Sequence, residues 1–100
     1  MKVTWYGHSC IGVSIGTHHI LIDPFISGNP KAAHIDMGKI PCTHLLVTHG
    51  HGDHVGDAVA IAKRTGAVLV SNYEVANWFA QQGVERTVGM NIGGSAEVDG

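Results

Sequence analysis

Apolar and polar residues alternate near the start of the chain in a way that predicts three short strands. The first covers residues 2–6, the second is the alternating segment 11–15, and the third covers residues 19–22. Pro24 follows the third strand and ends it, because proline has no N–H to donate to a central ladder. Only short turns separate the three segments, so we expect an antiparallel meander.

Strands and helices then alternate, after a loop without a clear period over residues 25–43. The predicted elements are a buried strand at 44–48, a helix at 58–65 that Gly66 ends, a strand at 67–70, a second helix that Gly83 ends, and strands at 84–88 and 95–98. A capping box of Ser71 and Glu74 opens the second helix. Its buried face is predicted to carry Val75, Trp78 and Phe79. This order predicts an α/β fold.

Length and charge narrow the class of protein. One hundred residues are enough for one small domain, and a net charge of -2 with six scattered Lys and Arg residues argues against a nucleic-acid partner. The N-terminus lacks the apolar core of a signal peptide, and no segment is long enough to span a membrane. Cys10 and Cys42 cannot form a disulfide framework, so we expect them to be buried thiols in a cytoplasmic protein.

Histidine is the unusual component, with eight residues in all and three of them in the run His49–His54. Side chains two apart in an extended segment point the same way, so His49 and His51 can bind one ion together. Asp53 and His54 then project toward a second position nearby. The run follows a buried strand, and open α/β sheets bind ligands at that edge. These residue types suit zinc, manganese or iron. The alternative is a surface loop without metal.

The motif formed by His49, His51, Asp53 and His54 resembles the metal motif of the metallo-β-lactamase superfamily. Four further segments resemble a branch of small, poorly characterised metal-dependent hydrolases related to the lactonase that acts on ascorbate 6-phosphate; they are residues 7–9, 22–25, 28–30 and 89–94. The resemblance covers essentially residues 1–100. It implies the N-terminal half of a single domain, an αββα four-layer sandwich in which a mixed sheet carries helices on one face.

The resemblance also implies roles for individual residues. His49 and His51 would bind the first metal, and Asp53 and His54 the second, with Asp53 also holding or deprotonating the nucleophilic water. Asp23 would hydrogen-bond a ligating histidine and fix its tautomer, although a turn-capping Asp before proline is the alternative. His8 would contact substrate or add a ligand, and the alternative is a turn histidine packed on Trp5. We expect one or two divalent ions, zinc first and then manganese or iron.

The other histidines are not assigned to the site. We expect His18 and His19 to be solvated, His44 to lie at the surface end of its strand, and His34 to face away from the site. Cys42 has no recognisable base nearby and is not expected to be a nucleophile.

The second half of the family fold would supply the remaining ligands, and the sequence lacks it. Asp99-Gly100 is a hairpin signal with no strand after it, so we expect the domain to be truncated there. Two ligands per ion are fewer than the three that a catalytic zinc has. We therefore expect weak metal binding by the chain alone. An open apolar sheet face would favour a homo-oligomer or a second chain that supplies the missing half.

The function predicted from these observations is hydrolysis of a small ester, lactone or phosphoester by a metal-activated water or hydroxide. One alternative is a ribonuclease-type metal-dependent hydrolase. The other is a non-catalytic metal-binding fragment that needs a partner chain.

Overall fold

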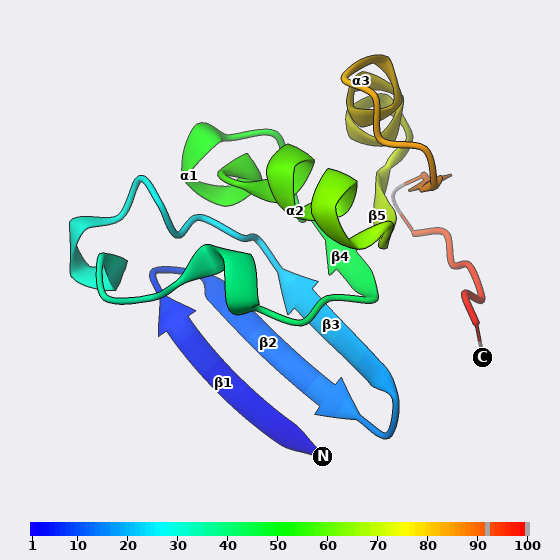
Figure 1. The fold of residues 1–100 in the computed structure, drawn as a ribbon. Helices are drawn as coiled ribbons and strands as arrows, with labels where there is room; N and C mark the ends of the chain where they lie inside the picture. The colour runs from blue at the N-terminus through cyan, green and yellow to red at the C-terminus, as the bar shows by residue number, and fades with distance from the viewer. Residues whose placement is uncertain (92, 100) are drawn as a thin grey trace.

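Six strands form one mixed sheet in the order in which they occur in the chain, β1-β2-β3-β4-β5-β6 (Figure 1). The computed structural model describes residues 1–91 and 93–99. The strands are β1 (Lys2–Gly7), β2 (Cys10–Ile15), β3 (His18–Ile22), β4 (His44–Leu46), β5 (Val68–Asn72) and β6 (Thr87–Met90). The first three pair antiparallel, which confirms the predicted meander, and the pairs from β3 to β6 are parallel.

Helices cover one face of this sheet (Figure 1). They are α1 (Gly52–Val55), α2 (Ala58–Thr65) and α3 (Tyr73–Gln81), with 3-10 turns η1 (Pro30–Ala32) and η2 (Met37–Lys39) in the long loop. Leu21, Leu45 and Leu69 lie in register on β3, β4 and β5 and are fully buried. They share a core with Ile61 of α2 and Phe79 of α3. The predicted mixed sheet with helices on one face is therefore confirmed.

The start of α3 differs from the predicted capping box. Asn72 is the N-cap, and its side chain accepts a hydrogen bond from the backbone N–H of Val75 at 2.9 Å. Ser71 still belongs to β5, and its hydroxyl donates across the sheet to the carbonyl of Val47 at 2.7 Å. Trp78 was wrongly placed in the core: it is 46% exposed, and Ala76 is buried in its place next to Phe79.

Two predicted strands also differ. β6 begins only at Thr87, because Val84 is buried in the turn after α3, where its N–H bonds the carbonyl of Phe79. Residues 95–98 form no strand within the described part of the chain. The hairpin predicted at Asp99-Gly100 cannot be compared, because Gly100 lies outside the described residues.

His44 was predicted to lie at the surface end of its strand, and this prediction is wrong. His44 is buried, because its ring takes part in two polar contacts beneath the C-terminal segment. Nδ1 lies 2.8 Å from the Thr43 hydroxyl oxygen, and Nε2 lies 2.8 Å from a carboxylate oxygen of Asp99. The contact with Asp99 ties the segment that follows β6 to the sheet. His18 is exposed, as predicted.

The sheet face opposite the helices is apolar. Residues paired on neighbouring strands form one row across all six strands, which we call the apolar register row. It consists of Trp5, Ile11, Ile22, Leu46, Val70 and Val88. Leu46 and Val70 directly follow the buried Leu45 and Leu69, so their side chains point to the other side of the sheet. None of the six residues in the row is buried. Part of this face lines a hollow of about 650 Å³.

Within the described residues, no helix is long and apolar enough to cross a membrane.

The two cysteines are free and buried, as predicted. Burial raises the pKa of Cys10 to about 12 and that of Cys42 to about 11. Both groups are therefore thiols rather than thiolates near neutral pH, which disfavours a nucleophilic role.

We predict that native protein at pH 8 reacts slowly with a thiol reagent such as Ellman's reagent, because reaction needs the exposed thiolate. The same protein in urea should titrate both residues quickly. Fast stoichiometric labelling of Cys10 or Cys42 in the native state would contradict the buried environment.

Candidate metal centre

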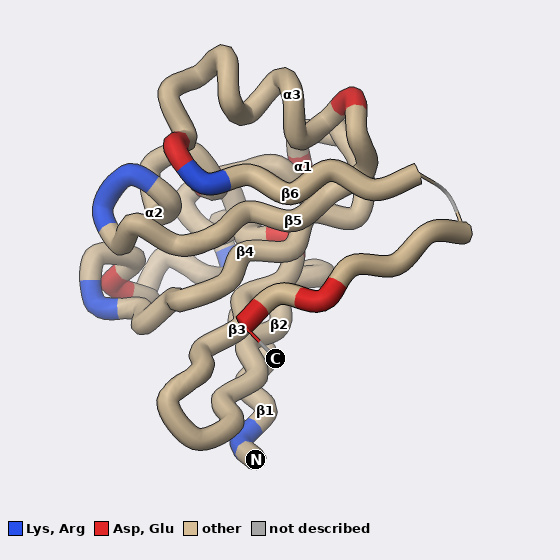
Figure 2. Tube along the Cα trace, turned by 90° about the vertical axis from the view of Figure 1, so that its right-hand side faces the viewer, with Lys and Arg blue, Asp and Glu red and all other residues tan. Residues whose placement is uncertain are grey.

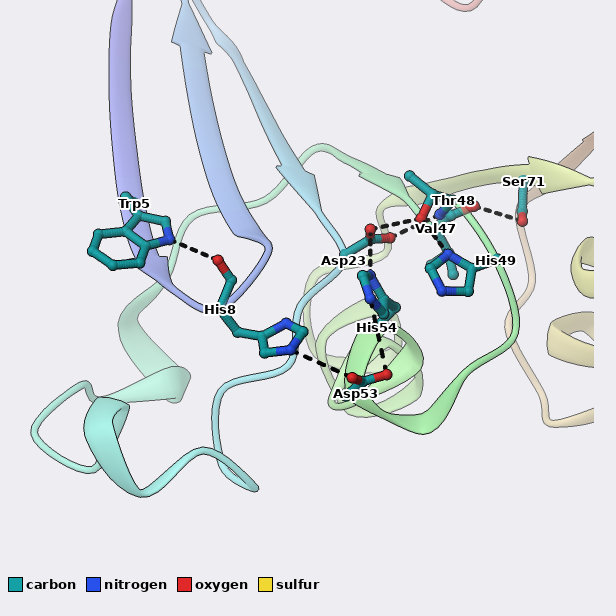
Figure 3. A network of polar contacts seen from close by, with 9 residues as sticks. All are labelled: Trp5, His8, Asp23, Val47, Thr48, His49, Asp53, His54 and Ser71. Atoms are coloured by element: carbon teal, nitrogen blue, oxygen red, sulfur yellow. Dashed lines mark hydrogen bonds and ion pairs between the residues drawn. The ribbon is translucent and has the colours of Figure 1, made fainter.

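The predicted site residues meet where β3 and β4 end (Figure 3). Asp23 follows β3 directly, and His49 comes shortly after β4. Asp53 and His54 lie on the short helix α1, which was not predicted. Because β3 and β4 are parallel, their carboxyl ends bring these segments to one edge of the sheet.

Asp23 is the buried centre of the network, with only 3% of its surface exposed. Its Oδ1 accepts a hydrogen bond from the backbone N–H of Thr48 at 2.7 Å. Its Oδ2 accepts from the Thr48 hydroxyl at 2.7 Å and from Nδ1 of His54 at 2.8 Å. Both carboxylate oxygens are thus already engaged. Asp23 lies close enough to His49 and His54 to be grouped with them as a ligand, but these bonds favour a positioning role.

These hydrogen bonds assign the tautomers of two histidines. His54 donates from Nδ1 to a carboxylate, which leaves the lone pair on Nε2. The single hydroxyl proton of Thr48 goes to Asp23, so the Thr48 oxygen accepts from Nδ1 of His49 at 2.8 Å. His49 therefore also has its lone pair on Nε2. One buried carboxylate orients His54 directly and His49 through Thr48, and both present a nitrogen that can bind a metal.

Asp53 lies between two imidazoles. Its Oδ2 is 3.4 Å from Nε2 of His8, and its Oδ1 is 3.9 Å from Nε2 of His54. The Asp53 side chain is half exposed, so a substrate or water can reach it. The ring of His8 contacts the rings of Phe25 and His54 edge to face, with centroids 5.6 Å and 5.3 Å away.

The predicted alternative for His8 placed its ring on Trp5. The contact is different: the indole N–H of Trp5 donates to the backbone carbonyl of His8 at 2.8 Å, while the imidazole points toward Asp53 (Figure 3).

The donor set fits a divalent cation. Ligand atoms from His8, Asp53 and His54 lie within 4.8 Å of one another, as do those from Asp23, His49 and His54. A tetrahedral zinc site holds its ligand atoms about 3.4 Å apart, so small side-chain rotations would close the group of His8, Asp53 and His54. Imidazole lone pairs and a carboxylate converge here, and these groups together bind divalent cations.

The structure groups the motif residues differently from the predicted pairs. The ring of His49 lies nearer to that of His54 (4.0 Å between centroids) than to that of His51 (4.7 Å). His51 is exposed and belongs to neither group of three. The assignment of His49 and His51 to one ion therefore stays a prediction.

Two of the three non-glycine residues with positive φ in the described part of the chain lie at this site, and the third is Asp99. His8 and Asp23 have positive φ values of 50° and 47°. Such conformations cost on the order of 1–3 kcal/mol each and persist where the surroundings hold them. Gly56 allows the end of α1 to pack tightly, because a Cβ there would lie 2.5 Å from the carbonyl oxygen of Pro24. The site is thus built on a constrained scaffold.

Thr48 is the site residue that the sequence reasoning missed. A hydroxyl residue between a buried strand and His49 was the available signal, but only its bonds to Asp23 and His49 reveal the role.

We predict that Asp23→Asn weakens zinc binding about 10–100-fold, measured by competition with a chromogenic chelator. The substituted amide would place N–H donors against the Thr48 hydroxyl or Nδ1 of His54, which favours the tautomer with the proton on Nε2. Asp57→Asn is the matched control, because within the described residues the Asp57 carboxylate accepts hydrogen bonds from the backbone N–H groups of Ile26 and Ser27 and from the Ser27 hydroxyl, and contacts no histidine. Equal affinity in wild type and Asp23→Asn would argue against the positioning role.

Comparison with known proteins agrees with this geometry. The sequence profile of the "Metallo-beta-lactamase superfamily" matches residues 3–97. A "UPF0173 metal-dependent hydrolase" of Methanopyrus kandleri is 55% identical over 100 residues, which cover 100% of this chain and 43% of that protein. Another from Flavobacterium johnsoniae is 48% identical over 99 residues, 99% of this chain and 44% of the relative. The chain thus spans less than half the length of these relatives.

A solved structure has the same fold. Igni18, described as a novel metallo hydrolase from the hyperthermophilic archaeon Ignicoccus hospitalis, superposes with a TM-score of 0.85 and 35% sequence identity. The match covers 97% of this chain and 42% of Igni18. With a family profile over nearly its whole length and this fold, the chain belongs to the metallo-beta-lactamase superfamily.

Proposed function

We propose that the protein containing this chain is a metal-dependent hydrolase of a small ester, lactone or phosphoester. The observation that carries the proposal is the pair His49 and His54, whose Nε2 lone pairs are held in place by Asp23 beside the half-exposed carboxylate of Asp53. The names of the relatives, metal-dependent hydrolase and metallo hydrolase, support the same class of reaction.

Each residue has a proposed task. His49, His51, Asp53 and His54 would hold one or two divalent ions. Bound ions would supply Lewis acidity and lower the pKa of a coordinated water. Asp53 is half exposed and would take up the proton of the attacking water through a carboxylate oxygen. His8 would keep Asp53 oriented through the contact at 3.4 Å, or touch the substrate.

Zinc is the ion that we propose first, because it is commonly bound by histidine and aspartate in open catalytic sites. Manganese and iron also accept these ligands. The two free thiols support a cytoplasmic location.

The charge distribution supports a small substrate rather than a nucleic acid. Basic residues of the described chain are spread over β1, η1, η2, α2 and the turn before β6, and acidic residues lie among them (Figure 2). Nucleic-acid surfaces gather Lys and Arg on one face. A ribonuclease activity would show itself by RNA binding that weakens steeply with salt.

We further propose that additional polypeptide, from the same protein or a second chain, covers the apolar sheet face and completes the metal ligands. The apolar register row supports this, as does the length of the relatives, of which this chain spans 43–44%. An open catalytic zinc site needs three protein ligands.

We predict that residues 1–100 expressed alone self-associate. The apolar register row, which includes Leu46 and Val70, exposes apolar surface to water on the sheet face opposite the helices. Sedimentation velocity should show a concentration-dependent mass above that of the monomer. Leu46→Lys should reduce association, and Trp78→Lys on the opposite layer is the control. A strictly monomeric chain with tight occupancy by two metals would contradict this proposal.

We predict that Asp53→Ala and His49→Ala each lower kcat/KM at least about 100-fold, since one removes the proton acceptor and the other a metal ligand. The measurement is a hydrolysis screen on esters, lactones and phosphodiesters, with the protein loaded in turn with zinc, manganese and iron(II). His18→Ala is the matched control, because His18 is exposed on the β2–β3 hairpin. Unchanged turnover in Asp53→Ala would rule out this site.

A further inference from the structure

A second hollow lies beside the metal centre, between the end of β1 and the loop that carries η1. It has a volume of about 610 Å³, which is within the range of small-molecule sites. We call it the Lys31 cavity, and its lining includes Trp5, Tyr6, His8, Asn29, Lys31 and His34. No function was expected for Lys31 or His34 from the sequence.

His8 connects this cavity to the metal centre. It lines the cavity, and its Nε2 is also 3.4 Å from a carboxylate oxygen of Asp53. Its ring contacts that of His54, with 5.3 Å between centroids. A molecule bound in the cavity would therefore be separated from Asp53 and His54 by a single side chain.

The polar groups that line the cavity favour a negatively charged ligand. Among the described residues, Lys31 is the only lining residue with a formal charge, and no carboxylate lines the cavity. Within residues 1–91 and 93–99, Lys31 takes part in no ion pair, whereas Lys39 on η2 lies 3.9 Å from Asp36. Oδ1 of Asn29 already accepts from the backbone N–H of Lys31, so its amide Nδ2 is the group left to donate. Ammonium and amide donors together bind carboxylate or phosphate oxygens.

The loop is fixed at both ends, so the cavity is preformed. Asp57 accepts hydrogen bonds from the backbone N–H groups of Ile26 and Ser27 at 3.0 Å and 2.8 Å. Arg64 of α2 donates to the carbonyl of Ile40 at 2.6 Å. Between these anchors, Asn29 caps η1. A preformed cavity binds its ligand without the entropy cost of ordering a loop.

We propose that the Lys31 cavity binds an anionic group of the substrate, a carboxylate or a phosphate, while the bond to be hydrolysed lies at His8, Asp53 and His54. Lys31 pairs with the anion, and His34 and the Asn29 amide add donors. Trp5 and Tyr6 contact the carbon skeleton. This inference rests on the proposed hydrolase function and narrows its substrates to small esters, lactones or phosphoesters that carry a second, anionic group.

Anion binding to the Lys31 cavity can be measured independently of hydrolysis. The complete, metal-free protein is titrated at low ionic strength with inorganic phosphate and, separately, with acetate by isothermal calorimetry. We expect binding of at least one anion, a loss of about tenfold or more in Lys31→Ala, and retention in Lys31→Arg. Lys39→Ala is the matched control, with the same charge change in the same loop outside the cavity. Absence of binding by both anions, or equal effects of Lys31→Ala and Lys39→Ala, overturns the proposal.

Paired substrates test its role in hydrolysis. The metal-loaded protein is compared on 4-nitrophenyl succinate, whose free carboxylate is anionic, and on neutral 4-nitrophenyl butyrate. We expect Lys31→Ala to lower the ratio of kcat/KM values, anionic over neutral, about tenfold through the KM for the succinate ester, whereas Lys39→Ala leaves this ratio as in the wild type. An unchanged ratio overturns the proposal. If neither ester nor any other screened substrate is hydrolysed, the proposed function fails, while anion binding still decides whether the cavity is a site.

Discussion

The buried carboxylate of Asp23 is the interaction on which the candidate site depends. It lies immediately after β3, in a backbone conformation that is unfavourable for a residue with a Cβ, and it accepts three hydrogen bonds. Two of these bonds set the orientation of His54 and, through Thr48, of His49. A buried carboxylate costs free energy unless it is fully hydrogen-bonded, so the same bonds that satisfy Asp23 also position the histidines.

The fold places this interaction where it can act. Parallel pairing of β3 with β4 brings Asp23 and Thr48 together, although 25 positions separate them in the chain. The buried leucine row on the helix-covered face keeps the strands in register, and Gly56 allows α1 to return against the segment after Asp23. Core packing thus determines the distances at the metal centre, and the loop that bears Lys31 adds a cavity beside it.

Much of this arrangement could be predicted from the sequence, for identifiable reasons. The alternating segment 11–15 and the cap at Gly66 are local patterns, and both were correct. The histidine run was conspicuous because three histidines and an aspartate follow a buried strand within six residues. The predicted capping box at Ser71 was wrong. A hydroxyl three residues before a glutamate is typical of a helix cap, but the Ser71 hydroxyl bonds the carbonyl of Val47, which follows β4. Thr48, the burial of His44 and the Lys31 cavity depend on contacts between distant segments, which no local pattern encodes.

Asp23 holds His49 and His54 with Nε2 of each ring free to bind a metal. Long-range proton–nitrogen NMR correlations on metal-free, histidine-labelled protein report the tautomer of each ring directly. We expect a proton on Nδ1 and a lone pair on Nε2 for both His49 and His54, and a shift of the Nε2 resonance of each ring when zinc is added. A proton on Nε2 of either ring in the metal-free protein, or a zinc-induced shift at Nδ1 instead, would contradict this role of Asp23.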